Sequence, residues 1–109
     1  MALTGVVWDP VYLEHVTDAG HPDHPRRLRL LYDRLQAPST AGQFTTVAPE
    51  PADDREILLV HSPAYLEQVK STAGKGEAAL SADTLTCDRS YHVAAMAAGG
   101  TINAIRKVL

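Results

Sequence analysis

The chain has 109 residues, with 10 basic and 13 acidic side chains and a formal net charge of −3. This acidic balance argues against a nucleic-acid or membrane-surface binder, because such proteins usually carry a basic excess. The single cysteine, Cys87, excludes an internal disulfide, and no apolar run reaches the ~18 residues that span a bilayer. We therefore expect one small cytoplasmic domain that has neither nucleic acid nor a membrane as a partner.

The first third of the chain predicts a strand, an irregular segment and a helix. Residues 5–8 form an apolar run that predicts a buried strand, which the Asp9-Pro10 pair ends. Residues 11–23 are rich in Gly, Pro, Asp and His, and irregular segments of this length are often functional. Residues 25–36 predict a helix that begins at Pro25, because an apolar stripe recurs at three- and four-residue steps: Leu28, Leu31, Tyr32 and Leu35.

The middle of the chain predicts a second strand and two short helices. Residues 44–47 predict the strand, since β-branched and aromatic residues stand between turn-forming ones. Asp53 or Asp54 can cap a short helix after it. Ser62 is expected to cap the next helix, which Gly74 would end.

The last third predicts a loop followed by a long helix. Residues 74–88 are small and polar and predict a loop, and Ser90 is expected to cap a helix over 91–109. Gly99 and Gly100 lie inside that helix, where each costs about 1 kcal/mol relative to Ala, so we expect another element to pack closely there. The apolar face of the helix consists of Val93, Met96, Ala97, Gly100, Ala104 and Val108.

The order of these elements predicts the fold class. Strands separated by helices indicate an α/β fold with a parallel sheet. Two short strands make a poor sheet by themselves, so the pattern predicts a third strand after Leu109.

The residues that bear chemistry do not compose a complete active site. His21 and His24 stand in a proline-containing loop without the glutamate of the HExxH zinc motif, so packing on the helix start is favoured over metal binding. Asp83 could contact a ligand, although a turn explains it more simply. Three arginines could bind an anion, although a solvated helix face is the favoured interpretation: Arg26, Arg27 and Arg29.

Five short motifs follow one another along nearly the whole chain. They are Asp9-Pro10, His21-Pro22-Asp23-His24-Pro25-Arg26-Arg27-Leu28, Val60-His61-Ser62-Pro63-Ala64-Tyr65-Leu66, Ala82-Asp83-Thr84 and Ala97-Ala98-Gly99-Gly100. This serial order resembles the N-terminal third of the family that comprises histone deacetylases, acetoin-utilisation proteins and acetylpolyamine amidohydrolases.

This resemblance implies a partial arginase/deacetylase-like fold, a three-layer α/β/α arrangement that is helix-rich here and has two short strands. Members of the family hydrolyse N-acetyl amides, on lysine or on a polyamine, with one bound zinc. In the family, the paired histidines, the zinc ligands and the oxyanion-stabilising tyrosine lie beyond the region matched here. The resemblance therefore implies zinc in the complete enzyme, and neither a catalytic residue nor a metal ligand on this chain.

Four positions can be carried over as contacts for substrate or product. Arg27 matches an arginine near the inner channel through which acetate leaves, and a guanidinium suits a small carboxylate. Asp83 matches an aspartate on a rim loop, which holds the substrate backbone by accepting N–H bonds. His21 and Pro22 would line the neighbouring loop.

Three interpretations follow. In the first, residues 1–109 are a single, incomplete N-terminal segment of a zinc-dependent deacetylase domain, inactive alone, whose zinc centre lies beyond residue 109. Its partners would be an acetylated small molecule or acetyl-lysine, together with a complementary C-terminal fragment or a second copy of the chain. In the second, the chain is a non-catalytic module whose self-association covers the stripe Val93, Met96, Gly100 and Val108. In the third, it is a small metal-binding protein that uses His21 and His24.

Overall fold

The structure is a computed structural model that describes residues 3–109. Its helices and strands in chain order are β1 (Thr4–Val7), the 3-10 helix η1 (Pro10–Glu14), α1 (Arg26–Gln36), the 3-10 helix η2 (Pro38–Thr40), β2 (Phe44–Val47), α2 (Asp54–Ile57), α3 (Pro63–Lys70), β3 (Ala78–Ser81), β4 (Thr84–Thr86) and α4 (Ser90–Val108).

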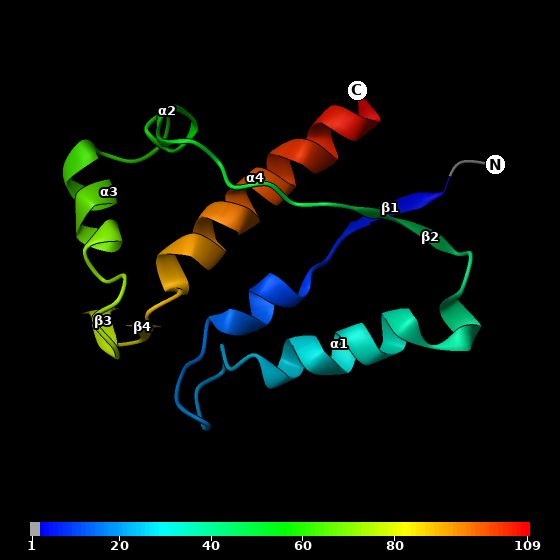
Figure 1. The fold of residues 1–109 in the computed structure, drawn as a ribbon, viewed down its shortest axis with the longest axis horizontal. Helices are drawn as coiled ribbons and strands as arrows, with labels where there is room; N and C mark the ends of the chain where they lie inside the picture. The colour runs from blue at the N-terminus through cyan, green and yellow to red at the C-terminus, as the bar shows by residue number, and fades with distance from the viewer. Residues whose placement is uncertain (1–2) are drawn as a thin grey trace.

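The two predicted strands pair in parallel, as the alternation of strands and helices indicated. Thr4 lies opposite Phe44, and Val7 lies opposite Val47. Parallel strands need a crossover connection, which α1 and η2 provide here. Figure 1 shows η1 between α1 and α4, and both helices contact it. The α/β prediction is therefore confirmed, with helices packed around a two-stranded parallel sheet.

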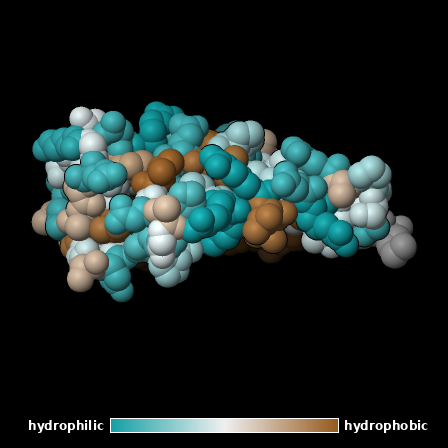
Figure 2. Space-filling model, turned by 90° about the horizontal axis from the view of Figure 1, so that it is seen from below, coloured by the Kyte–Doolittle hydropathy of each residue, from teal (hydrophilic) through white to brown (hydrophobic). Residues whose placement is uncertain are grey.

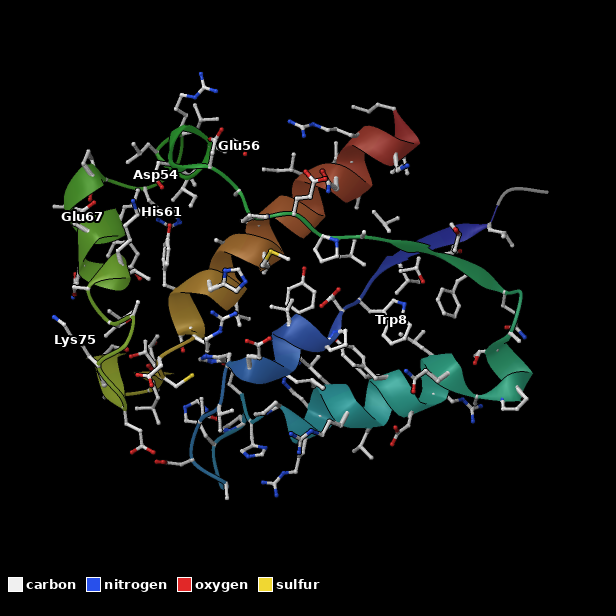
Figure 3. All side chains as sticks on the ribbon, in the orientation of Figure 1. Trp8, Asp54, Glu56, His61, Glu67 and Lys75 are labelled. Atoms are coloured by element: carbon white, nitrogen blue, oxygen red, sulfur yellow. The ribbon has the colours of Figure 1, made fainter. Side chains whose placement is uncertain are left out.

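Helix α1 is anchored to the end of β1 by one aromatic pair. Tyr32 is buried and packs edge-to-face on Trp8, with ring centroids 5.3 Å apart, and its hydroxyl donates to the Asp9 carbonyl at 3.0 Å. Trp8 lies between the sheet and α1 in Figure 3. Pro25 is the N-cap of α1 rather than its first helical residue. The predicted stripe is only partly covered, since Leu31 keeps 57% of its surface exposed.

The predicted starts of α2 and α3 are confirmed, because each has a local capping signal. Asp53 and Glu56 form a capping box, in which each side chain accepts from the other residue's backbone N–H. The Ser62 hydroxyl accepts from the Tyr65 backbone N–H at 3.1 Å. Helix α3 ends at Lys70, four residues before Gly74, which adopts a positive φ of 73° in the turn that follows.

The loop predicted over residues 74–88 is wrong. This segment contains the antiparallel hairpin of β3 and β4, in which Ala78 lies opposite Thr86 and Ala79 opposite Leu85. Ala78 and Leu80 are half-buried while Ala79 and Ser81 are exposed, which is the two-residue alternation of a strand. Small, polar residues of low strand preference hid this alternation. The described chain thus has four strands instead of the two expected.

Helix α4 begins differently from the prediction, whereas the close packing predicted at its two glycines is confirmed. Ser90 is the first helical residue rather than the cap, because Arg89 occupies the N-cap position without a side-chain bond. Gly99 and Gly100 are buried, and a β-carbon on either would collide with residues outside α4, so the expected close packing is confirmed.

The apolar stripe of α4 is divided between the chain's own core and solvent. Val93 and Gly100 are buried, whereas Val108 keeps 83% of its surface exposed. We expected a second copy of the chain to cover the whole stripe. This expectation is wrong for Val93 and Gly100, because the chain itself buries them. The small core consists of Val11, Tyr32, Val47, Ala52, Leu66, Val93 and Ala95.

Large apolar side chains also stay at the surface. Leu59, Val60 and Leu30 are each more than 70% exposed. Figure 2 shows apolar residues gathered along the middle of one face, between hydrophilic ones. Within residues 3–109, no helix combines the length and the apolar character that crossing a bilayer requires.

Candidate functional site

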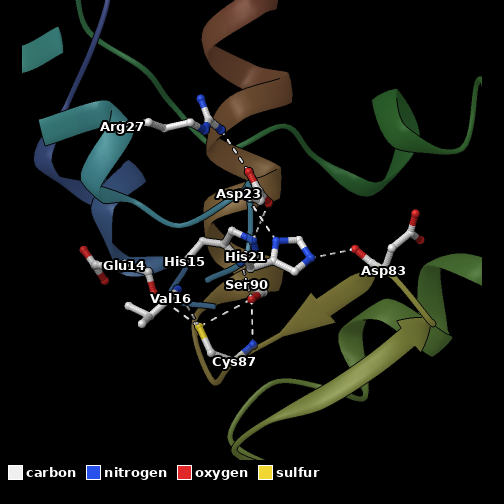
Figure 4. Close-up of polar contacts among 9 residues, drawn as sticks. All are labelled: Glu14, His15, Val16, His21, Asp23, Arg27, Asp83, Cys87 and Ser90. Carbon is white, nitrogen blue, oxygen red and sulfur yellow. Dashed lines mark hydrogen bonds and ion pairs between the residues drawn. The ribbon is translucent and has the colours of Figure 1, made fainter. Parts of the chain in front are cut away.

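Two loops meet beside the start of α4, and they carry three of the predicted site residues, of which two come into contact (Figure 4). The Nε2 atom of His21 lies 3.0 Å from the backbone carbonyl oxygen of Asp83. The Nδ1 atom of His21 accepts from the backbone N–H of Asp23 at 3.1 Å. These contacts fit a neutral imidazole that is protonated at Nε2. His21 and Asp83 are therefore brought together, although they are 62 residues apart.

The carboxylate of Asp83 is left available to another molecule. Its Oδ1 accepts from the Ser81 hydroxyl at 3.0 Å, and the residue is exposed. Pro22 is exposed at the tip of its loop and does not border the hollow that His21 and Asp83 line.

Sequence reasoning missed His15, which lies at the centre of the polar contacts. Its Nδ1 atom is 2.7 Å from the Ser90 hydroxyl, and its Nε2 atom is 2.9 Å from Oδ2 of Asp23. No local motif could have identified this residue, because its partners are 75 and 8 residues away in the chain.

Asp23 joins His15 to the predicted product-binding arginine. The Arg27 guanidinium donates to Oδ1 of Asp23 at 2.9 Å while His15 holds Oδ2. Burial alone would raise the pKa of the Asp23 carboxyl, but the hydrogen bonds from Arg27 and His15 outweigh it and lower that pKa. Asp23 is therefore ionised at neutral pH. The Arg27 side chain is 56% exposed and has further N–H groups for an anion.

Cys87 connects the end of the hairpin to η1. Its thiol lies 3.3 Å from both the backbone nitrogen of Val16 and the carbonyl of Glu14, and it is 3.4 Å from the Ser90 hydroxyl. Arg89 adds an ion pair to the Glu14 carboxylate at 2.7 Å. Burial would raise the pKa of the Cys87 thiol, but hydrogen bonds from Ser90 and from backbone N–H groups outweigh it and lower that pKa.

Two hollows in the surface share part of their lining, namely His15, Asp23, Val93 and Ala97. A rim hollow of about 300 Å³ is also lined by His21 and Asp83. An inner hollow of about 450 Å³ is also lined by Arg27 and by mainly apolar residues of β1 and α1. The structure therefore places His21 and Asp83 at one hollow and Arg27 at the other.

The described residues do not form a zinc site. Among residues 3–109, no three His, Cys, Asp or Glu side chains converge as metal ligands. Both ring nitrogens of His21 are engaged, and Nδ1 of His24 accepts from the Arg26 backbone N–H at 3.2 Å. The interpretation of a His21/His24 metal site has no geometric support.

Comparison with known proteins decides the family. The family sequence model of the histone deacetylase domain matches residues 21–109. The chain belongs to the histone deacetylase family. The matched range includes His21, Pro22, Arg27 and Asp83 and begins after His15. The resemblance that the five motifs indicated is confirmed.

The chain also matches individual members of this family from an animal and from a bacterium. The chain is 35% identical over 91 residues to the polyamine deacetylase HDAC10 of Danio rerio, an alignment that covers 78% of this chain and 14% of that protein. It is 32% identical over 91 residues to the histone deacetylase-like amidohydrolase of Pseudomonas aeruginosa, covering 84% and 24%. The chain thus spans less than a third of either family member.

A solved deacetylase structure has the same fold. The HDA15 HD domain superposes with a TM-score of 0.82 at 24% identity, over 91% of this chain and 30% of that one. The predicted partial α/β deacetylase fold is therefore confirmed, although the prediction lacked the β3–β4 hairpin.

Proposed function

We propose that residues 1–109 form the N-terminal part of a zinc-dependent deacetylase domain that hydrolyses N-acetyl amides of the acetyl-lysine or acetylpolyamine type. One observation carries the proposal: His21 and Asp83 line one hollow, Arg27 lines another, and the hydrogen-bonded pair His15 and Asp23 borders both. Family membership and the names of the relatives support acetylated amines as the substrate class.

In this proposal Asp83 holds the substrate at the rim. Its exposed carboxylate accepts from the Ser81 hydroxyl and has capacity for further bonds, so it can accept N–H bonds from a substrate backbone. His21 borders the acyl-carrying side chain, whereas Pro22 lies outside this hollow. Because His21 already bonds the Asp83 carbonyl, the two sides of the rim are held at a defined separation.

Arg27 receives the acetate product in the inner hollow. Its guanidinium donates one N–H to Asp23, and its other N–H groups can donate to a carboxylate. Asp23 also limits this binding, since an acetate beside Arg27 approaches another negative charge. Release of the product is therefore favoured over its retention.

The zinc of the family does not fit the residues described here, so we assign no step of the reaction to it. We assign the metal ligands, the general base and the oxyanion donor to a part of the domain outside residues 3–109, either covalently continuous or supplied as a complementary fragment.

A hybrid enzyme tests the proposal. The segment of the Pseudomonas aeruginosa relative that matches this chain is replaced by residues 1–109, and hydrolysis of an acetyl-lysine peptide and an acetylpolyamine is measured with zinc. We expect turnover by the hybrid and none by the 109-residue chain alone. Asp83→Asn in the hybrid should raise KM, whereas Asp33→Asn, on the exposed side of α1, should not. A folded hybrid without activity, or turnover by the isolated chain, would contradict the proposal.

A further inference from the structure

The geometry points to His15 as a positioning residue, which fixes the loop that carries His21 and Pro22 against the loop that carries Asp83. This inference rests on the proposed function for its effect on substrate, but the contact it describes is a property of the 109-residue chain. His15 does not itself touch the substrate in this assignment; it acts through Asp23 and Ser90 (Figure 4).

The first loop is tied to His15 through Asp23. Oδ2 of Asp23 lies 2.9 Å from Nε2 of His15, and the backbone N–H of Asp23 donates to Nδ1 of His21 at 3.1 Å. A movement of Asp23 therefore moves the ring of His21. Arg27 holds the other oxygen of Asp23 at 2.9 Å, so the carboxylate cannot turn away without breaking two charge-assisted bonds.

The second loop is tied to His15 through Ser90. The Ser90 hydroxyl lies 2.7 Å from Nδ1 of His15, and it also accepts from the backbone N–H of Cys87 at 2.8 Å. Cys87 directly follows β4, and Asp83 directly precedes it. The ring of His15 thus bridges the His21 loop and the Asp83 loop with both of its nitrogens.

Burial makes the Ser90 half of this bridge stronger than the direct contact between the loops. Ser90 is only 7% exposed and the His15 side chain 21% exposed, so little water competes for the bond between them, whereas the Asp23 side chain is 46% exposed. The direct bond from His21 to the Asp83 carbonyl is exposed. Water can replace an exposed neutral bond at little cost, whereas loss of the imidazole would leave the buried Ser90 hydroxyl without that partner.

The arrangement also differs from a serine nucleophile with its base. Ser, His and Asp are the residue types of such a triad. Here the Ser90 hydroxyl is buried and already accepts from Cys87, which suits a brace between loops. A substrate-binding rim that is assembled from distant segments needs such a fixed contact, because binding groups act well only when their separation is set before the substrate arrives.

Amide hydrogen exchange of the 109-residue chain tests the bridge directly. Asp23→Asn weakens it from the first loop and Ser90→Ala from the second. We expect each variant to increase exchange about tenfold in both loops, residues 15–24 and residues 82–89, while the β1–β2 sheet stays protected. Asp18→Asn, an exposed carboxylate of the first loop, and His61→Gln, an exposed histidine of another region, are the controls. If each substitution loosens only its own loop, the inference is overturned.

The hybrid enzyme supplies the readout that a purely structural residue would not give. His15→Leu should raise KM for the acetylated peptide about tenfold and change kcat less than about twofold, because rim placement affects substrate binding. His15→Gln, whose amide can donate to Asp23 and accept from Ser90 once that hydroxyl turns from the Cys87 sulfur, should restore KM to within about threefold of the unsubstituted hybrid. Equal loss of kcat in both variants, or no change in KM in either, overturns the inference.

The two experiments separate the possible failures. A hybrid that lacks activity before any substitution refutes the proposed function, while the exchange measurement still decides whether His15 couples the loops. An active hybrid in which His15→Leu leaves KM unchanged refutes the positioning role alone.

Discussion

Gly99 of α4 lies directly beneath the backbone carbonyl of Glu50. A β-carbon built on Gly99 would stand 1.6 Å from that oxygen and 2.7 Å from the backbone nitrogen of Ala52. The same segment is bonded to the helix, because the Ala52 backbone N–H donates to the Ala95 carbonyl at 2.9 Å. The chain that leaves β2 therefore crosses α4 at backbone contact distance, and only glycine allows this crossing.

Gly99→Ala is the sharpest test of this crossing. Helix propensity alone would favour Ala by about 1 kcal/mol. We nevertheless expect the substitution to lower the free energy of unfolding by about 3 kcal/mol, because the added methyl group forces the crossing segment away. Urea denaturation followed by circular dichroism measures the change.

Gly20→Ala is the matched control for that substitution. In the described part of the chain, nothing lies within 4 Å of a β-carbon at Gly20. We expect its free energy of unfolding to stay within about 0.5 kcal/mol of the original chain or to rise slightly, since Ala restricts the unfolded chain. Equal effects of the two substitutions would mean that Gly99 has no special role.

Local signals were sufficient to predict the helix starts and the close approach to α4. Asp53 with Glu56, and Ser62 by itself, satisfy backbone donors within three residues, and Pro63 has no backbone N–H to satisfy. The effect of these residues therefore does not depend on the rest of the fold. A pair of glycines inside a helix likewise indicates contact with a neighbour, although it does not say which neighbour.

Contacts between distant segments could not be predicted in this way. Ser90 looked like a helix cap because it precedes an apolar run, yet its hydroxyl bonds His15 and the Cys87 backbone instead. The β3–β4 hairpin escaped because Ala and Ser carry little strand preference. His21 and Asp83 were found through a family resemblance, whereas His15, which connects their loops, had no motif of its own.

Thr86→Val is expected to stabilise the protein. The Thr86 hydroxyl is buried without a hydrogen-bond partner among residues 3–109, as is that of Thr17. Removing a buried, unpaired hydroxyl while keeping a β-branched side chain in β4 should raise the free energy of unfolding by about 1 kcal/mol. Thr84→Val, at an exposed position of the same strand, controls for strand propensity. A loss of stability in Thr86→Val alone would show that the hydroxyl has a partner in solution.

The ionised Asp23 should make stability fall in acid. Its pKa is lowered in the folded state by Arg27 and His15 in spite of burial, so the folded protein binds a proton there less readily than the unfolded chain. The stabilisation is present above the ordinary carboxyl pKa and is lost as pH falls through the lower, folded value. Asp23→Asn should flatten this acid limb of the stability profile.

The measurement is urea denaturation between about pH 2 and pH 6, where carboxylates titrate. Asp33→Asn removes an exposed carboxylate of α1 and controls for the change in net charge. An unchanged acid limb in Asp23→Asn would show that the pairs with Arg27 and His15 do not stabilise the fold.

Cys87 offers a chemical probe of its contact with Ser90. Hydrogen bonds to the sulfur, that from the Ser90 hydroxyl foremost, lower the pKa of this thiol in spite of burial and so favour the thiolate. Alkylation by iodoacetamide should therefore reach half its maximal rate at a lower pH than for a free cysteine. Because Cys87 is the only cysteine, the rate reports on it alone.

Ser90→Ala removes the principal donor to the sulfur and should move the midpoint of the alkylation profile to higher pH. The midpoint is read rather than the absolute rate, since the variant also changes access of the reagent to the half-buried thiol. Ser81→Ala, in the same hairpin but without a contact to Cys87, should leave the midpoint in place. A midpoint that is equal in the two variants would mean that the hydroxyl donates to His15 rather than to the sulfur, which is the arrangement in which Nδ1 of His15 carries no proton.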